Sequence, residues 1–248
     1  MSRKVAVLGA RGRMGSATCD ALNAAPDLTL VASIGSDGSI AEAVHAGADT
    51  VVDFTTPDAV MGNVRDALAA GLHVVVGTSG FDETRVTTVR SYVDEATDLG
   101  VVIAPNFALG AVLLMRFARE AAPLFESVEI VELHHPDKLD APSGTATHTA
   151  EVIGASRAAA NCEAMPDATS RALDGARGAS VAGVPVHSVR LRGLIAHEEV
   201  LMGNAGELLT IRHDSLDRQA FMPGVLLAVR RVAHRPGVTV GLEDLLDL

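Results

Sequence analysis

Short apolar runs alternate with longer amphipathic segments through the first hundred residues. The apolar runs predict buried strands at residues 5–8, 28–32, 51–54, 73–76 and 101–104. Between them, helical spacing extends to residue 24 and over 57–70 and 82–98. Continuous apolar strands separated by helices are typical of parallel βαβ units. The pattern therefore predicts an α/β fold, a Rossmann-like doubly wound parallel sheet.

The pattern changes after residue 106. Helical segments are expected at 109–125, 145–160 and 223–233, a strand at 127–133, and antiparallel strands at 186–192, 198–202 and 207–213. The intervening stretch 161–185 has no clear period, which suggests a functional loop, an interaction arm or a surface excursion. These elements predict a second α+β domain with an open mixed or antiparallel sheet. Because an open sheet exposes one face, a homo-oligomer is expected.

Composition narrows the class of protein. Apolar residues make up 48% of the chain and aromatic residues 3%, so the core is built from aliphatic side chains. The net charge of −11 disfavours non-specific binding of nucleic acid. Cys19 and Cys162 lie far apart and imply no disulfide framework, so a reducing cytoplasm is the expected compartment. We expect neither a secretory signal nor a membrane span, since no apolar run has the necessary length.

A glycine-rich turn follows the first predicted strand and opens the first helix. Its spacing is GxxGxxG, and it comprises Gly9, Ala10, Arg11, Gly12, Arg13, Met14 and Gly15. Glycines at such a turn allow a tight bend and close approach of backbone to a pyrophosphate. The alternative is a strand–helix connection that is glycine-rich for packing alone. Because strand, turn and helix all fall where a dinucleotide site needs them, we favour cofactor binding.

The residues after the second predicted strand bear on the choice of cofactor. NAD-dependent folds often carry an acid there, but the segment 32–38 has no carboxylate before Asp37, which we expect to lie too far along. Arg11 could approach a 2′-phosphate, so the sequence leaves NADH and NADPH both open. Two further loops end predicted strands, where ligands of such sheets bind. They are Gly77, Thr78 and Ser79, and Ala104, Pro105, Asn106 and Phe107.

The run from residue 132 to 146 carries the most chemistry. It holds His134, His135 and Lys138, followed by a Pro-Ser-Gly-Thr sequence that is typical of a helix start. Imidazole and ammonium groups transfer protons, and a helix start attracts anions. The alternatives are a solvent-exposed loop and a metal site that includes Asp137 and Asp140. We expect no metal, because no complete ligand set is present and Lys138 adds positive charge.

These segments resemble the 4-hydroxy-tetrahydrodipicolinate reductase family, also called dihydrodipicolinate reductase. The resemblance rests on residues 9–15, 77–81 and 104–107, and above all on ELHHPDKLDAPSGTA at 132–146. It implies that NADH or NADPH reduces a cyclic dicarboxylate to tetrahydrodipicolinate, with loss of water, in diaminopimelate and lysine biosynthesis. It also implies a homotetramer and a dinucleotide domain of residues 1–106 and 216–248, with 107–215 for substrate binding and oligomerisation.

The resemblance implies a role for each candidate residue. His134 and Lys138 would be catalytic, and His135, Ser143, Gly144 and Thr145 would bind substrate. Residues 9–14, 77–79 and 104–107 would bind the cofactor. The departure from the family pattern lies at residues 33–37, where many members carry an acid.

Two other readings remain open from the sequence. A dehydrogenase of the aspartate-semialdehyde type needs a thiol nucleophile, and neither Cys19 nor Cys162 lies in a suitable context. A non-catalytic, dinucleotide-sensing regulator would have no reason to keep the histidine–lysine cluster beside an anion-binding helix start.

Overall fold

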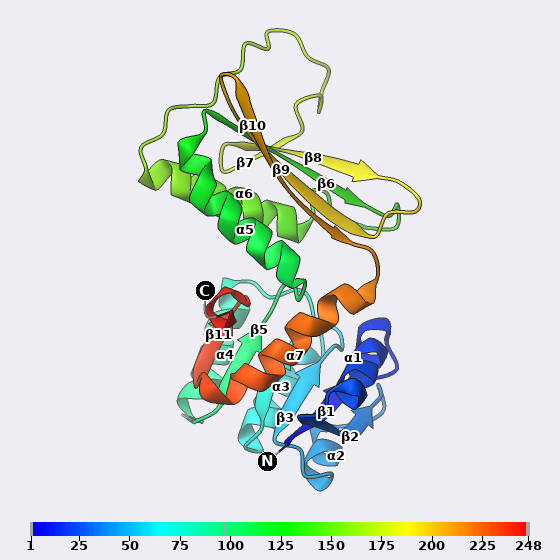
Figure 1. Cartoon of the computed structure of the whole chain (residues 1–248). Coiled ribbons are helices and arrows are strands. Elements are labelled where there is room, and N and C mark those ends of the chain that lie inside the picture. The colour runs from blue at the N-terminus through cyan, green and yellow to red at the C-terminus, as the bar shows by residue number, and fades with distance from the viewer. Residues whose placement is uncertain (1, 97, 247–248) are drawn as a thin grey trace. The chain divides into compact units, whose positions relative to one another are not determined.

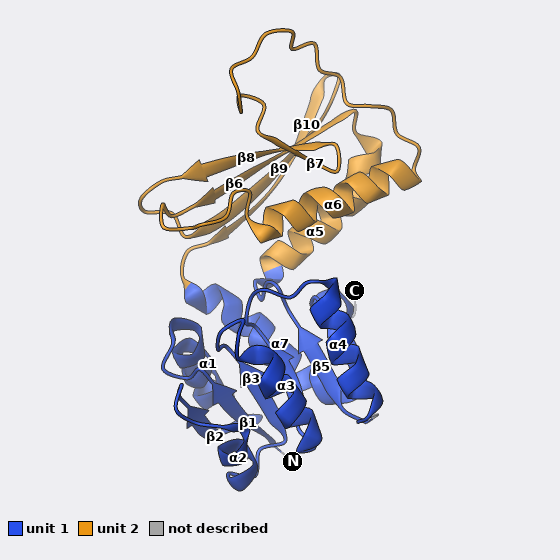
Figure 2. Ribbon diagram, turned by 180° about the vertical axis from the view of Figure 1, so that it is seen from behind, with its two compact units in different colours: residues 1–109, 218–248 blue, residues 110–217 orange. Residues whose placement is uncertain are grey.

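The computed structural model describes residues 2–96 and 98–246. They form two compact units, one built from the residues up to Leu109 together with those from Arg218 onward, and the other from Gly110–Asp217 (Figure 2). No helix within these described ranges is long and apolar enough to cross a membrane.

The first unit contains a parallel sheet of six strands among the residues described, in the order β11-β5-β4-β3-β1-β2 (Figure 1). Its strands are β1 (Arg3–Leu8), β2 (Leu28–Ile34), β3 (Thr50–Asp53), β4 (His73–Val76), β5 (Gly100–Ile103) and β11 (Gly237–Val240). Its helices are α1 (Arg13–Ala24), α2 (Ile40–His45), α3 (Val60–Ala69), α4 (Glu83–Asp94) and α7 (Met222–Arg231), with 3-10 turns at Arg218–Phe221, Val232–His234 and Glu243–Leu245.

Alternation along the strands supplies a core to each face of this sheet. Ala6 and Leu8 point to the face covered by α2, α3 and α4, where Val64, Val89 and other aliphatic side chains are buried. Val5 and Val7 are equally buried and point the other way, toward the side where α1 and α7 pack together. Strands that are covered on both faces must be apolar throughout, which is the pattern seen in the sequence.

Two elements of the first unit escaped the sequence analysis. The short helix α2 has only one and a half turns and begins with a capping box formed by Ser39 and Glu42. Strand β11 lies beyond the last predicted helix, and it extends the sheet by pairing with β5. Both elements are too short to show a hydrophobic period.

The second unit contains a mixed sheet in the order β10-β9-β6-β8-β7 (Figure 1). Its strands are β6 (Ser127–His134), β7 (Ala179–Val181), β8 (Val184–Arg190), β9 (Ala196–Asn204) and β10 (Glu207–Ser215). Helices α5 (Leu109–Ala121) and α6 (Gly144–Ala159), with a 3-10 turn at Ala122–Leu124, lie along one face of the sheet (Figure 2). Ile130, Val186, Val200 and Met202 are buried on that face.

The pairing of β8 corrects one expectation. The sequence pattern predicts it among antiparallel strands, but β8 runs parallel to β6 and is not hydrogen-bonded to β9. The physical reason is the connection: α6 carries the chain back from the end of β6, as a parallel crossover requires. The stretch 161–185 is largely irregular but also contributes β7 at the edge of the sheet.

The predicted fold class is confirmed. The first unit is a Rossmann-like, doubly wound parallel sheet, and the second is an α+β unit whose sheet is covered by helices on one face.

Candidate active site

The glycine-rich turn has the close backbone packing that a dinucleotide site needs. Gly9 has φ +71°, and a Cβ there would lie 2.4 Å from the carbonyl oxygen of Phe54. A Cβ at Gly15 would lie 2.2 Å from the carbonyl oxygen of Gly9. Only glycine fits at either position, so β1, the turn and the start of α1 are drawn tightly together. Gly12, which has no side chain, holds the N-cap position of α1 and leaves the helix start open to an anion.

Phe54 joins three of the predicted cofactor segments. The turn at Gly9 packs on its backbone, and its ring lies 5.7 Å from the ring of Phe107, centroid to centroid. A Cβ at Gly77 would fall 2.1 Å from the Phe54 ring, so glycine makes room for the ring there. The structure therefore brings the turn, the Gly77 loop and Phe107 to one place, at the carboxyl ends of β1, β3, β4 and β5.

Asp53 organises the same edge of the sheet. It is fully buried at the end of β3, and its Oδ1 accepts hydrogen bonds from Thr55 and from the Thr78 hydroxyl, the latter at 2.8 Å. Its Oδ2 accepts a hydrogen bond from Asn63 at 2.8 Å. Asp53 therefore fixes the Gly77–Ser79 loop, while the amide side chain of Asn106 accepts from the backbone N–H of Ala108 and fixes the Ala104–Phe107 loop.

Arg11 and Asp37 form an ion pair beside the turn. Arg11 Nη1 lies 3.3 Å from Asp37 Oδ1, and both side chains are mostly exposed. The loop after β2 therefore folds back toward the glycine turn and brings Asp37 to Arg11. A carboxylate and a guanidinium thus lie side by side next to the glycine turn.

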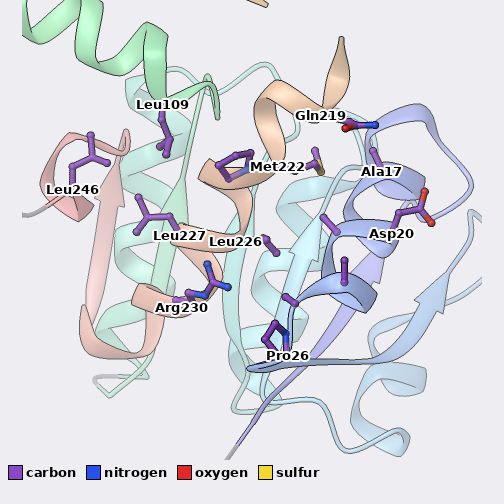
Figure 3. A pocket seen from close by; sticks show the side chains of 14 residues that line it. Ala17, Asp20, Pro26, Leu109, Gln219, Met222, Leu226, Leu227, Arg230 and Leu246 are labelled. Carbon is purple, nitrogen blue, oxygen red and sulfur yellow. The ribbon is translucent and has the colours of Figure 1, made fainter.

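An apolar cavity of the first unit lies elsewhere (Figure 3). It has a volume of about 1000 Å³ and lies between α1 and α7, lined by apolar side chains such as Met222, Leu226 and Leu227. None of the predicted cofactor residues in the described ranges lines it. It is a groove between helices on one side of the sheet and is distinct from the nucleotide edge.

Strand β6 brings Glu132 and His134 to the same face, two positions apart. His134 Nδ1 lies 2.5 Å from Glu132 Oε2. The Glu132 carboxylate can only accept, so Nδ1 carries the hydrogen and donates it. The other ring nitrogen, Nε2, is thereby the atom of the ring that does not face Glu132 and can accept a proton.

Glu132 is held by more than His134. Arg190 donates to both carboxylate oxygens, at 2.8 and 2.9 Å, and the backbone N–H of Ser143 donates to Oε1 at 3.2 Å. Burial alone would raise the pKa of Glu132, but the hydrogen bonds from His134, Arg190 and Ser188 outweigh it and lower the pKa to about 2. Glu132 is therefore a carboxylate at any pH at which the protein works.

The backbone turns directly after His134. The N–H of Lys138 donates to the carbonyl of His135, so the segment 135–138 is a turn, as Pro136 suggested. His135 is exposed, and Lys138 lies 2.7 Å from Asp140 Oδ1. Partial burial would raise the pKa of Asp140, but hydrogen bonds from Lys138 and from the backbone N–H of Gly144 lower it.

Helix α6 begins where the sequence predicts it. Ser143 is the N-cap, and its hydroxyl accepts from the backbone N–H of Ala146 at 3.2 Å. Gly144 and Thr145 form the first turn of the helix, whose N–H groups point toward the end of β6. The backbone N–H of Gly144 at this helix start interacts with the Asp140 carboxylate.

The buried carboxylate of Glu132 thus contacts His134, Arg190 and the backbone of Ser143, whereas Lys138 contacts Asp140 in the segment that leads to α6. Gly144 and Thr145 follow Ser143 in the first turn of that helix. Sequence reasoning missed the roles of Glu132 and Arg190. The spacing of Glu132 and His134 could have shown that they share a strand face, but nothing local links Arg190 to them. Within the described residues no three His, Cys, Asp or Glu side chains gather as a metal site.

Comparison with known proteins gives a consistent result over the whole chain. The family model for dihydrodipicolinate reductase, N-terminus, matches residues 3–107, and that for its C-terminus matches 110–246. The chain is 58% identical to 4-hydroxy-tetrahydrodipicolinate reductase of Streptomyces griseus, over 99% of this chain and 98% of the relative. It is 57% identical to the protein of the same name from Nocardia farcinica, over 100% of each.

A solved structure agrees in fold. Dipicolinate-bound dihydrodipicolinate reductase from Paenisporosarcina sp. TG-14 superposes with a TM-score of 0.87 and 36% identity, over 98% of this chain and 99% of that one.

A parallel nucleotide sheet with a glycine turn, joined to a unit that carries a proton-transfer cluster, defines an oxidoreductase that depends on a nicotinamide dinucleotide. Its family uses NADH or NADPH. The chain belongs to the dihydrodipicolinate reductase family.

Proposed function

We propose that the protein reduces 4-hydroxy-tetrahydrodipicolinate, the hydrated form of dihydrodipicolinate, to tetrahydrodipicolinate and water, and that it serves diaminopimelate and lysine biosynthesis. The observation that carries the proposal is the arrangement around Glu132. It directs His134 Nε2 outward at the end of the strand that leads to Lys138 and to the carboxylate-binding start of α6.

The cofactor-binding edge fits a dinucleotide. The close packing at Gly9 and Gly15 leaves the start of α1 open to a pyrophosphate, and we assign Gly9, Ala10, Arg11, Gly12, Arg13 and Met14 to it. The loops Gly77–Ser79 and Ala104–Phe107, anchored by Asp53 and by the Phe54–Phe107 ring pair, would line the nicotinamide half. The reduced cofactor, when bound, supplies the hydride.

The substrate carries two carboxylates, and the second unit offers donors for them. Lys138 and the backbone N–H of Gly144 hold the Asp140 carboxylate, and we propose that a substrate carboxylate takes over these donors. Ser143 and Thr145 complete the helix start, and exposed His135 lies in the turn at 135–138 that carries Lys138. The dipicolinate named in the solved relative is a planar diacid of the same kind.

Proton transfer balances the reaction. Loss of water from the hydroxylated ring leaves a conjugated imine, and addition of a hydride moves an electron pair to the far end of that system. His134 Nε2 gives a proton to the carbon that becomes negative, and Lys138 is a second proton donor. Glu132 stabilises the His134 imidazolium in this role, because a carboxylate at 2.5 Å compensates its charge.

The direct test is an assay of the purified chain. With the product of dihydrodipicolinate synthase as substrate, oxidation of NADH or NADPH should be seen as loss of absorbance. His134→Gln should lower kcat by about 10²–10⁴-fold while the affinity for cofactor is retained. If both cofactors bind and neither is consumed, the protein is a sensor and the proposal is wrong.

We further propose that the protein is a cytoplasmic homotetramer. Leu208 of β10 lies on the face of the second sheet that lacks helices, where its side chain is 68% exposed, and the partly buried Leu201 of β9 lies on the same face. Association through this face would cover them. Light scattering of the full chain should give four times the monomer mass; a monomer at micromolar concentration would contradict this.

A further inference from the structure

A row of polar side chains crosses the helix-covered face of the second sheet. Ser188 of β8 pairs in register with Glu132 of β6, Glu132 with Glu198 of β9, and Glu198 with His213 of β10. Residues directly opposite one another share a face, and their Cβ atoms lie about 4.5–5.5 Å apart. The neighbours of this row along the strands, such as Ile130 and Val200, are aliphatic and buried.

Glu198 differs from the other residues of this row in having a buried carboxyl oxygen that lacks a hydrogen-bond partner among the described residues. Its side chain is 4% exposed, and this oxygen is Oε1. The side-chain hydrogen bond that the structure gives Glu198 is shared with the hydroxyl of Thr149, from α6. A carboxylate in such surroundings is poorly stabilised, whereas a neutral carboxylic acid is tolerated.

The two carboxyl groups in the row therefore differ in charge. Each oxygen of Glu132 already accepts two hydrogen bonds, from Arg190 and Ser143 on Oε1 and from His134 and Arg190 on Oε2. Glu132 is thus ionised without help from Glu198. Burial and, to a lesser degree, the charge of Glu132 raise the pKa of Glu198 to about 7, although the bond from Thr149 acts in the opposite direction.

The groups that face Glu198 come from each element packed against it. Strand β6 contributes Glu132, and β10 contributes His213, whose ring lies against Gly110 at the start of α5. Helix α6 contributes the uncharged Thr149. His134 and the guanidinium of Arg190 belong to the same cluster through their bonds to Glu132.

We propose that Glu198 is a positioning residue, a second buried carboxyl that acts on His134 through Glu132 and sets how firmly the imidazole keeps its proton. This rests on the proposed function, in which His134 gives a proton to the substrate. When Glu198 is neutral, Glu132 is the one carboxylate of this row that interacts with His134. When Glu198 ionises, a second negative charge lies one strand away, and the protonated imidazole is favoured.

The coupling can be measured without turnover. In the full chain labelled with ¹⁵N-histidine, the His134 resonances, assigned with His134→Gln, should show an inflection near neutral pH that reports Glu198. In Glu198→Gln, which keeps the size and removes the charge, this inflection should vanish. The midpoint of the His134 titration should move to lower pH by about 0.5–1 unit.

The matched control is the next residue. Glu199 lies on the opposite face of β9 and forms an ion pair with Arg212 at 2.6 Å, so Glu199→Gln removes the same charge without touching the row. Its His134 titration should match that of the wild type. Thr149→Val gives a second test, since loss of its hydroxyl should move the inflection to higher pH.

The pH dependence of kcat distinguishes a failure of this coupling from a failure of the proposed function. The alkaline limb of the kcat profile should move to lower pH in Glu198→Gln, by the same amount as the His134 midpoint. An unchanged His134 midpoint would overturn the coupling alone. A shifted midpoint with an unchanged profile would instead overturn His134 as the proton donor, and with it the positioning role of Glu198.

Discussion

Arg190 donates two parallel hydrogen bonds to the Glu132 carboxylate, at 2.8 and 2.9 Å. Its guanidinium also donates a hydrogen bond to the backbone carbonyl of Asp140. One side chain from β8 thus ties the buried carboxylate of β6 to the loop that carries Lys138. The arrangement depends on a planar fork of donors, which lysine lacks.

Arg190→Lys should therefore weaken the hydrogen bonds that hold Glu132, and through it His134, and the bond that holds the loop at Asp140. We expect a loss of about 3 kcal/mol in the free energy of unfolding, because the buried carboxylate loses its bidentate partner. Urea denaturation measures this, and kcat should fall in parallel. Arg192→Lys, two residues along and exposed, is the control and should behave as wild type.

Glu132→Gln should impair catalysis more than binding. The amide can donate to Nδ1, which would place the ring hydrogen on Nε2 and leave His134 in the wrong tautomer for its role. We expect kcat to fall by about 10²-fold or more. The affinity for NADH and NADPH, measured by fluorescence titration, should be unchanged; a large loss of affinity would show that the two units are not independent in this respect.

The two buried carboxyls should have opposite effects on stability as pH changes. The pKa of Glu132 is lowered to about 2, so its contribution is present above the ordinary value of 4.5 and is lost as pH falls toward 2. The pKa of Glu198 is raised to about 7, so the folded state binds an extra proton between 4.5 and 7, and stability falls as pH rises through that window. Glu198→Gln should therefore gain in Tm relative to wild type between pH 5 and pH 8. A constant difference in Tm would contradict the burial of an ionisable group at this position.

Lys138 offers a chemically matched comparison, because the sequence has only one other lysine, Lys4. Lys138→Met should raise KM for the dicarboxylate and lower kcat, since Lys138 holds a carboxylate at the start of α6. Lys4→Met, in β1, should leave both unchanged. Competition by 2,6-pyridinedicarboxylate should weaken in Lys138→Met alone; equal inhibition of all three proteins would place the diacid elsewhere.

The Arg11–Asp37 pair predicts how the cofactors are distinguished. Arg11→Ala should lower kcat/KM for NADPH by about tenfold, the loss of one charge-assisted contact to the 2′-phosphate, and change that for NADH little. Asp37→Ala should shift the ratio toward NADPH, because it frees Arg11 and removes a ribose acceptor. Steady-state kinetics with both cofactors measure the ratio; identical effects of Arg11→Ala on the two would rule out this role.

The sequence predicted those features that depend on neighbouring residues, such as buried strands and helix caps. Buried parallel strands need unbroken apolar runs, so residues 5–8 and 101–104 were recognisable, and Ser143 marked the start of α6 by its capping chemistry. Glu132 and His134 were visible in the motif, but their mutual bond required knowing that β6 is straight up to His134. Arg190 was not visible at all, since it reaches Glu132 only because α6 and the stretch after it return the chain parallel to β6. Glu198 looked like an ordinary charged residue of a half-exposed strand until its neighbours on both sides were known.

The nucleotide sheet has a consequence for biosynthesis of the chain. Its edge strand, β11, pairs with β5 although more than a hundred residues separate them in sequence, and α7 packs on α1 from the same late segment. As the chain leaves the ribosome, β6 to β10 are all made before the nucleotide unit receives its last strand. The inserted unit is thus able to fold first, and the dinucleotide fold is completed only after β11 has been made.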